Sequence, residues 1–180
     1  MIDFKHPAGS HVITSAVEHP AILNPLLYLM ELGLRVTILP VDSMGRVDPE
    51  DVRRALEPDT VLVSIMLANN ETGTIQPIEE ISQITQDHGV LLHTDAAQAV
   101  GKMNVDVRQL RVDLMSVAGH KLYAPKGVGA LYVREGVSLT PLIHGAGQEM
   151  NKRAGTENVM FAKGLGTACR VVKERCPRDV

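Results

Sequence analysis

The chain has 180 residues, which is enough for one domain with a hydrophobic core. Hydrophobic residues make up 44% of it and aromatic residues only 3%, so the core is expected to be aliphatic. The net charge of −3 gives no basic footprint for nucleic acid. No apolar run approaches the roughly 20 residues of a membrane span, and residues 1–10 have no apolar signal-peptide core. The sequence therefore predicts a soluble cytoplasmic protein with no nucleic-acid or membrane partner.

Histidine and cysteine show no pattern typical of a metal site or a disulfide framework. The seven histidines are spread along the chain rather than clustered. Cys169 and Cys176 lie seven residues apart near the C-terminus, where one helix is predicted. We expect both to be reduced thiols and expect no bound metal.

Short β-branched segments alternate with helical segments along the chain. Pro20 is placed to begin a helix, and Asp48 is a typical N-cap. The continuous apolar run at 60–67 is typical of a strand covered on both faces. The alternation predicts an α/β three-layer sandwich with a mostly parallel sheet. The predicted strands are 11–15, 35–40, 60–67, 90–94, 113–117 and 127–134, the last a candidate for antiparallel pairing. The predicted helices are 20–32, 48–56, 77–89, 107–110 and 158–174.

Polar side chains follow three of the predicted strands. Asn70 comes after the strand at 60–67, Asp95 after the next one, and Lys121 after the one at 113–117. In parallel sheets, ligands lie beyond the carboxyl ends of the strands, so an amide, a carboxylate and an amine are expected in one crevice. The alternative is that each is only a loop or helix-cap residue, a common role for Asn and Asp.

These residue types suit the chemistry of pyridoxal 5′-phosphate (PLP). A lysine is needed to form an imine with the cofactor aldehyde, and a carboxylate is needed beside the pyridine nitrogen to keep it protonated. A cationic neighbour helps a buried lysine lose its proton, which imine formation requires. The sequence therefore predicts a PLP site around Lys121 and Asp95.

Five motifs occur in an order that carries a family resemblance. They are VEHPAI (17–22), MLANNETG (66–73), HTDAAQ (93–98), GHKLYAPKG (119–127) and RAGTEN (153–158). Together they resemble the cysteine desulfurases and selenocysteine lyases of the class-V PLP-dependent aminotransferase superfamily. The resemblance implies the large domain of a fold-type I PLP enzyme, here incomplete. Residues 1–10 are expected to be an N-terminal extension and residues 11–180 a partial PLP-binding large domain.

The resemblance also implies roles for individual residues. Lys121 would carry PLP as a Schiff base, and His19 would stack on the ring and take part in proton transfer. Both are therefore the candidate catalytic residues. Thr156 would reach the phosphate in the neighbouring subunit, which implies a homodimer; the alternative is a loop residue before a helix. The other implied cofactor contacts are Asp95 to the pyridine nitrogen, Gln98 to the ring hydroxyl from the same helix face, His120 to the phosphate, and Asn70 near the substrate carboxylate.

Several features of the family are missing from this sequence. The family's Gly-Thr phosphate loop lies upstream of the segment matching His19, and its catalytic cysteine and carboxylate-binding arginine lie downstream of the segment matching Thr156. Cys169 and Cys176 match neither position. Ala118 stands where many desulfurases have a phosphate-binding serine, a substitution that resembles selenocysteine lyases.

Three functions follow from this comparison of motifs. The first is removal of sulfur or selenium from L-cysteine or L-selenocysteine to give L-alanine, impaired by truncation, as a transferase or lyase with a sulfur or selenium acceptor protein. The second is a non-catalytic homologue that acts in dimerisation or partner binding. The third is another PLP reaction that needs no cysteine nucleophile.

Overall fold

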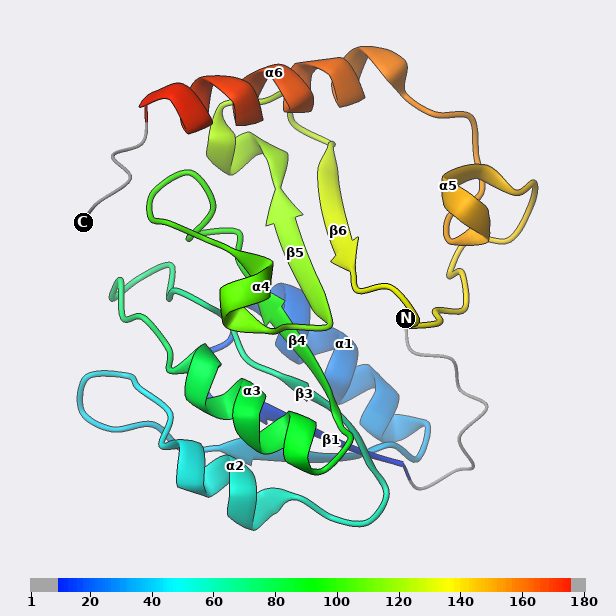
Figure 1. Cartoon of the computed structure of the whole chain (residues 1–180). Helices are drawn as coiled ribbons and strands as arrows, with labels where there is room; N and C mark the ends of the chain where they lie inside the picture. The colour runs from blue at the N-terminus through cyan, green and yellow to red at the C-terminus, as the bar shows by residue number, and fades with distance from the viewer. Residues whose placement is uncertain (1–9, 176–180) are drawn as a thin grey trace.

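The computed structural model describes residues 10–175, and their centre is a mixed β-sheet (Figure 1). Within those residues the sheet has six strands in the order β2-β1-β3-β4-β5-β6. All neighbouring pairs are parallel except β5 and β6, which are antiparallel. The strands are β1 (His11–Ser15), β2 (Arg35–Leu39), β3 (Thr60–Ser64), β4 (Leu91–Asp95), β5 (Leu114–Ala118) and β6 (Gly129–Val133).

Helices cover both faces of this sheet, which gives three layers (Figure 1). α1 (Pro20–Glu31) lies on one face, while α2 (Pro49–Ala55), α3 (Ile78–Asp87) and α4 (Val107–Leu110) lie on the other. This arrangement confirms the predicted α/β fold with a mostly parallel sheet. The remaining elements are η1 (Gly119–Leu122), α5 (Gln148–Asn151) and α6 (Val159–Arg175).

Alternating side chains of each strand enter two separate cores. Ile13, Val63 and Leu92 pack beneath α2, α3 and α4, and all three are fully buried. Val12 and Leu62 point to the opposite face, beneath α1. Because side chains of a strand alternate with a period of two, strands buried on both faces read as continuous apolar runs. The α1 side is packed less completely and keeps an apolar cavity of about 330 Å³.

A row of hydrogen bonds crosses three parallel strands on the α1 side of the sheet. The ring of His93 on β4 lies between two hydroxyls, with Nδ1 2.8 Å from Ser64 Oγ on β3 and Nε2 2.9 Å from Ser116 Oγ on β5. Burial lowers the pKa of His93 to about 4, against an opposing effect from the carboxylate of Asp95. The imidazole is therefore neutral at ordinary pH, and one of its nitrogens donates while the other accepts.

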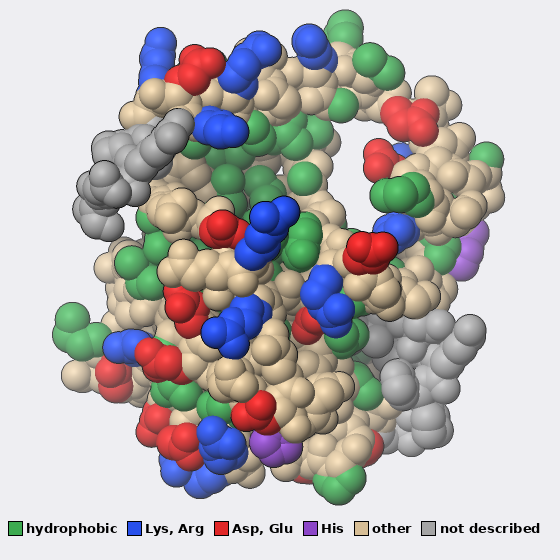
Figure 2. Space-filling view, in the orientation of Figure 1, with side chains coloured by type: hydrophobic (Ala, Val, Ile, Leu, Met, Phe, Trp, Pro, Cys, Tyr) green, Lys and Arg blue, Asp and Glu red, His purple; other side chains and the backbone are tan. Residues whose placement is uncertain are grey.

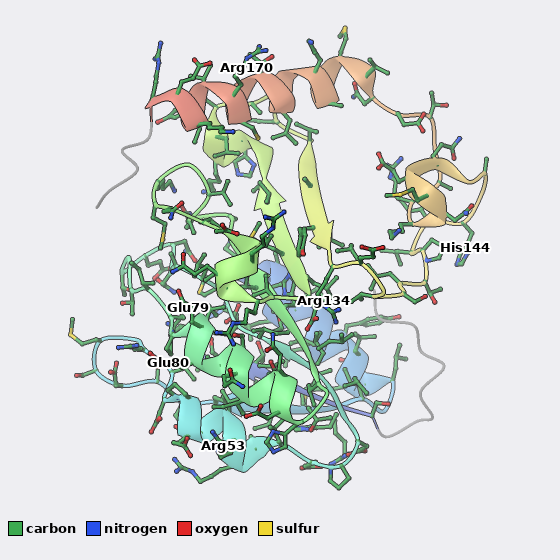
Figure 3. All side chains as sticks on the ribbon, viewed as in Figure 1. Arg53, Glu79, Glu80, Arg134, His144 and Arg170 are labelled. Carbon is green, nitrogen blue, oxygen red and sulfur yellow. The ribbon has the colours of Figure 1, made fainter. Side chains whose placement is uncertain are left out.

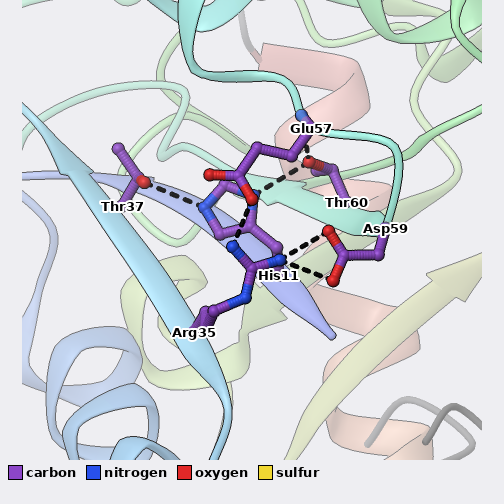
Figure 4. A network of polar contacts seen from close by, with 6 residues as sticks. All are labelled: His11, Arg35, Thr37, Glu57, Asp59 and Thr60. Carbon is purple, nitrogen blue, oxygen red and sulfur yellow. Dashed lines mark hydrogen bonds and ion pairs between the residues drawn. The ribbon is translucent and has the colours of Figure 1, made fainter. Parts of the chain in front are cut away.

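A second polar network joins the amino ends of β1, β2 and β3 (Figure 4). His11 Nδ1 lies 2.8 Å from Thr60 Oγ1, and its Nε2 lies 2.8 Å from Thr37 Oγ1. Arg35 pairs with Glu57 and Asp59 at the same edge. Burial lowers the pKa of His11, although the nearby carboxylate of Glu57 raises it. This network joins the three strands at their amino ends, whereas the candidate site lies at the carboxyl ends of the strands.

Charged side chains of both signs are interspersed on the viewed surface, without a single-sign cluster (Figure 2). Arg53, Glu79 and Glu80 lie on the outer sides of α2 and α3 (Figure 3). Arg134 donates to Asp113 at 2.6 Å and so ties the end of β6 to the start of β5. No helix within residues 10–175 is long and apolar enough to cross a bilayer.

The structure differs from the predicted elements at the strand that begins at Thr60 and in two short helical elements. The strand predicted at 60–67 ends at Ser64, although the backbone amides of Ile65 and Leu67 still donate to carbonyls of His93 and Asp95. The short elements η1 and α5 were not predicted, because four-residue segments carry no periodic signal. The N-terminal extension proposed for residues 1–10 lies, apart from Ser10, outside the described residues.

The buried His93 generates a prediction about stability at low pH. Its folded pKa of about 4 lies below the ordinary 6.5, so the unfolded chain binds more protons between these values. The stabilising effect of the neutral ring is fully present above about pH 6.5 and is lost as the pH falls towards 4, by roughly 3 kcal/mol. We expect the free energy of unfolding to fall more steeply across this range in the wild type than in His93→Gln. Urea unfolding at several pH values measures this; parallel curves for the two proteins would contradict it.

Candidate functional site

A cavity of about 490 Å³ opens at the carboxyl ends of the central strands. Its volume lies within the usual range for small-ligand sites. The sheet order reverses here, because β1 is followed by β2 on one side and by β3 on the other. Ligand sites of open α/β sheets are typically found at such a switch point. Six of the seven predicted site residues line this cavity: His19, Asn70, Asp95, Gln98, His120 and Lys121.

His19 reaches the cavity from the start of α1. It is the N-cap of that helix, with extended backbone angles, and its ring Nδ1 accepts from the amide of Ala21 at 3.1 Å. Pro20 follows as the first helical residue, where its missing N–H costs nothing. In the neutral ring, Nδ1 as acceptor leaves the proton on Nε2. The capping role and the position at the cavity therefore coexist in one side chain.

Asp95 and Gln98 reach the cavity from the end of β4. Asp95 Oδ1 accepts from the amide of Ala97 at 2.9 Å, and Oδ2 has no partner within residues 10–175. The expectation that Gln98 shares a helix face with Asp95 is wrong, since the segment after β4 forms two consecutive turns, closed by amides that donate to Ala96 O and then to Ala99 O. The turns still bring Gln98 to the cavity, where Lys102 donates to its side-chain oxygen.

Asn70 lies at the cavity after β3, on a turn that its neighbour Asn69 builds. Asn69 Oδ1 accepts from the amides of Glu71 and Thr72, each at 2.9 Å. Gly73 completes the turn at φ 75°, a conformation that favours glycine. The turn role that Asn70 could have played thus belongs to Asn69, and the Asn70 side chain makes no hydrogen bond within the described part of the chain.

Lys121 and His120 lie on η1, the short helical turn after β5. Gly119 begins η1, with its amide donating to Val128 O at 3.0 Å, so the turn stays against the start of β6. A Cβ atom on Gly119 would lie 2.5 Å from that carbonyl oxygen, which only glycine avoids. α6 packs on the other side of η1, where Leu122 is buried. The turn is therefore held from two sides while Lys121 faces the cavity.

The polar groups of the cavity fit a cofactor with an aldehyde, a phosphate and a basic ring nitrogen. The side chains of Lys121, His120 and Asn70 make no hydrogen bond or ion pair to the rest of residues 10–175. An amine, an imidazole and one unpaired carboxylate oxygen of Asp95 are thus available in one cavity. The amine of Lys121 suits an aldehyde, the imidazole of His120 suits a phosphate, and the carboxylate oxygen of Asp95 suits a protonated pyridine.

Three other residues of interest lie away from the cavity in this chain. Thr156 is exposed on the segment between α5 and α6, and Arg153 on that segment donates to Ala154 O. Cys169 is an exposed thiol on α6. None of the three lines the cavity. Cys176 falls outside the described residues, whose His, Cys, Asp and Glu side chains form no cluster of three or more suited to a metal.

Sequence reasoning missed Glu18, a buried carboxyl next to the cavity. Only 5% of this residue is exposed, and its Oε1 accepts from Ser15 Oγ at 2.7 Å and from the amide of Met66 at 2.9 Å. Oε2 is buried without a partner in the described chain. Burial raises the pKa of Glu18 to about 7, and the carboxylate of Asp95 adds to this rise. The sequence signal was a glutamate directly before His19, between a strand and a helix.

The close approach at Gly119 generates a prediction. Gly119→Ala would force Cβ against Val128 O, so we expect a loss of roughly 1–3 kcal/mol in the free energy of unfolding, typical of an added methyl in a packed site. Gly166→Ala is the matched control, because it lies in α6 with open space around it. That change should be neutral or stabilising. Equal stabilities of the two variants in urea unfolding would contradict the account.

Comparisons with known proteins place this geometry in a family. The model of the aminotransferase class-V family matches residues 3–177. The cysteine desulfurase IscS of Dictyoglomus turgidum is 56% identical over 160 residues, which cover 89% of this chain and 41% of that protein. A mitosomal cysteine desulfurase of Trachipleistophora hominis is 48% identical over 183 residues, covering 99% of this chain and 42% of that protein.

Solved structures agree with the sequence relatives. A NifS-like protein superposes with a TM-score of 0.89 at 43% identity, over 92% of this chain and 46% of that one. SspA in complex with cysteine superposes with a TM-score of 0.88 at 43% identity, over 91% and 48%. The chain thus spans less than half the length of these relatives. By its matched family model, its relatives and its fold, the chain belongs to the class-V aminotransferase family, which is PLP-dependent.

Proposed function

We propose that this chain is the PLP-binding part of a cysteine desulfurase, with Lys121 as the residue that attaches the cofactor. The observation that carries the proposal is the convergence of six predicted residues on one cavity, from the ends of β1, β3, β4 and β5. Residues this far apart in the sequence have no local reason to meet. Their side chains also supply the groups that PLP requires.

The family resemblance implies a role for each of these residues, and their chemistry and their places in the cavity support it. With PLP bound, the amine of Lys121 would hold its aldehyde, and the adjacent imidazole of His120 would bind its phosphate. Oδ2 of Asp95, which has no partner in residues 10–175, would pair with the protonated ring nitrogen, and the bound cofactor would then supply an electron sink for bond cleavage at the substrate. His19 would contact the cofactor ring and can hold a proton at Nε2, because Nδ1 accepts from the amide of Ala21. Gln98 and Asn70 complete the polar lining.

Cysteine is the substrate that we favour over selenocysteine. The curated relatives are named as cysteine desulfurases, and the structure of SspA is described as a complex with cysteine. Ala118, the position that resembles selenocysteine lyases, lines the cavity and offers no hydroxyl there. The proposed reaction is removal of sulfur from L-cysteine to give L-alanine, with transfer of the sulfur to an acceptor protein.

The two remaining parts of the proposal concern groups outside this cavity. Thr156 and Arg153 lie on the segment before α6, away from the cavity of the same chain, so we propose that Thr156 serves the phosphate of a second subunit in a homodimer. Among the described residues no thiol lines the cavity, since Cys169 is exposed on α6. This observation favours a second candidate function, a PLP-binding module that does not turn over cysteine by itself.

Attachment of PLP to Lys121 is tested by the absorbance of the purified chain with added PLP. The wild type should develop the visible band of a lysine-bound cofactor, and Lys121→Ala should lose it. Lys163→Ala is the matched control, because Lys163 is exposed on α6 and does not line the cavity. It should keep the band. A wild type without the band, or a Lys121→Ala variant that keeps it, would refute the proposed site.

Release of alanine from cysteine then separates the two candidate functions. Lys121-dependent alanine formation would support a desulfurase that works within this chain. A Lys121-dependent absorbance band without alanine formation would support the PLP-binding module. Alanine formation that is equal in the wild type and in Lys121→Ala would contradict both.

A further inference from the structure

Two buried side chains cross-connect the segments that carry His19 and Asn70. Glu18, on the turn between β1 and α1, accepts from the amide of Met66 beyond β3 at 2.9 Å. In the opposite direction, Asn69 beyond β3 donates from Nδ2 to the carbonyl of Val17 at 2.9 Å. The two hydrogen bonds join residues that are 48 and 52 positions apart in the sequence. We call this pair of contacts the Glu18–Asn69 clamp.

Each clamp residue comes directly before a cavity-lining residue in the sequence. Glu18 precedes His19, and Asn69 precedes Asn70, and both followers are exposed side chains at the cavity. The clamp residues themselves are buried, with 5% of Glu18 and 9% of Asn69 exposed. Neither lines the cavity, so neither contacts a ligand there. Their hydrogen bonds therefore act on the cavity through these two neighbours and through Met66, which also lines the cavity and donates its amide to Glu18.

The clamp is also anchored on both sides. Glu18 Oε1 accepts from Ser15 Oγ at 2.7 Å, which ties the carboxyl back to the end of β1. Asn69 Oδ1 accepts from two amides of its own turn, which fixes the orientation of the amide group that reaches Val17. Removing either side chain would leave a buried amide or carbonyl of the other segment without its partner. Such losses loosen a site even where the fold persists.

From this geometry we propose that Glu18 and Asn69 are positioning residues that hold His19 and Asn70 in place for the cofactor. This inference rests on the proposed function and goes beyond it, because it assigns the precision of the PLP site to two side chains that never contact PLP. One carboxyl oxygen of Glu18 accepts both hydrogen bonds, so the proposed role depends on an acceptor at this position.

Glu18→Gln and Glu18→Ala separate positioning from charge. Glutamine keeps an oxygen that can accept from Ser15 and Met66, whereas alanine removes both contacts. We expect Glu18→Ala to weaken PLP affinity by about tenfold, the size of one lost hydrogen bond, and Glu18→Gln to stay within about twofold of the wild type. Asn69→Ala should weaken affinity in the same direction as Glu18→Ala.

A double-mutant cycle with His19→Ala tests whether Glu18 acts through His19. If it does, Glu18→Ala combined with His19→Ala should bind PLP no more weakly than His19→Ala alone. Full additivity of the two losses would overturn the positioning role. Val52→Ala is the stability control, because it opens a buried site on α2, on the other face of the sheet. It should lower the free energy of unfolding and leave PLP affinity unchanged.

A measurement on the protein without PLP keeps the clamp testable by itself. The ring signals of His19 in NMR spectra of the free protein, assigned with His19→Ala, should shift in Glu18→Ala and remain near wild type in Glu18→Gln. Unchanged signals in Glu18→Ala would overturn the clamp whether or not PLP binds. If Glu18→Ala shifts these signals but the wild type does not bind PLP, the clamp is supported and the proposed function is refuted.

Discussion

The parallel pairing of β3, β4 and β5 is the constraint on which the candidate site depends. Ser64 pairs with His93, and Asp95 pairs with Ser116, so the three strands end at one edge of the sheet. The residues that follow them therefore enter the same space. The row of contacts from Ser64 through His93 to Ser116 runs across these strands, and a slip in register would break it. The buried row and the cavity are thus two consequences of one alignment.

Short turns held by hydrogen bonds direct side chains from the aligned strand ends into the cavity. Asp95 closes its own turn through the amide of Ala97, and Gly119 allows η1 to lie against Val128. The Glu18–Asn69 clamp joins the two turns that come from β1 and β3. Each of these contacts leaves one functional group directed at the cavity while its neighbours are fixed. The site is polar where a ligand would bind and hydrogen-bonded within the protein just behind it.

The fold and the location of the site were predictable because both leave a local pattern in the sequence. Apolar periodicity marks the strands and helices, and polar residues mark the ends of the strands. Apolar runs followed by Asn70 or Asp95 predicted the strands and their polar ends, and the structure brings Lys121 and His19 of the motifs to one cavity, where their roles toward PLP stay predictions. The details that failed depend on tertiary contacts. The helix expected after Asp95 is a series of turns, and the strand from Thr60 stops at Ser64 while its backbone still pairs with β4. Glu18 was missed because its burial and its hydrogen bond to the amide of Met66, beyond β3, are tertiary contacts that no sequence pattern shows.

The central claim, that this cavity holds PLP on Lys121, is tested most directly by locating the cofactor on the chain. The protein is incubated with PLP, the imine is reduced with borohydride to a stable amine, and the modified lysine is identified by peptide mass spectrometry. The account predicts modification at Lys121, and its loss when Asp95 is replaced by Ala and PLP binding is weakened. Modification spread over exposed lysines such as Lys126 and Lys163, with none favoured, would contradict it.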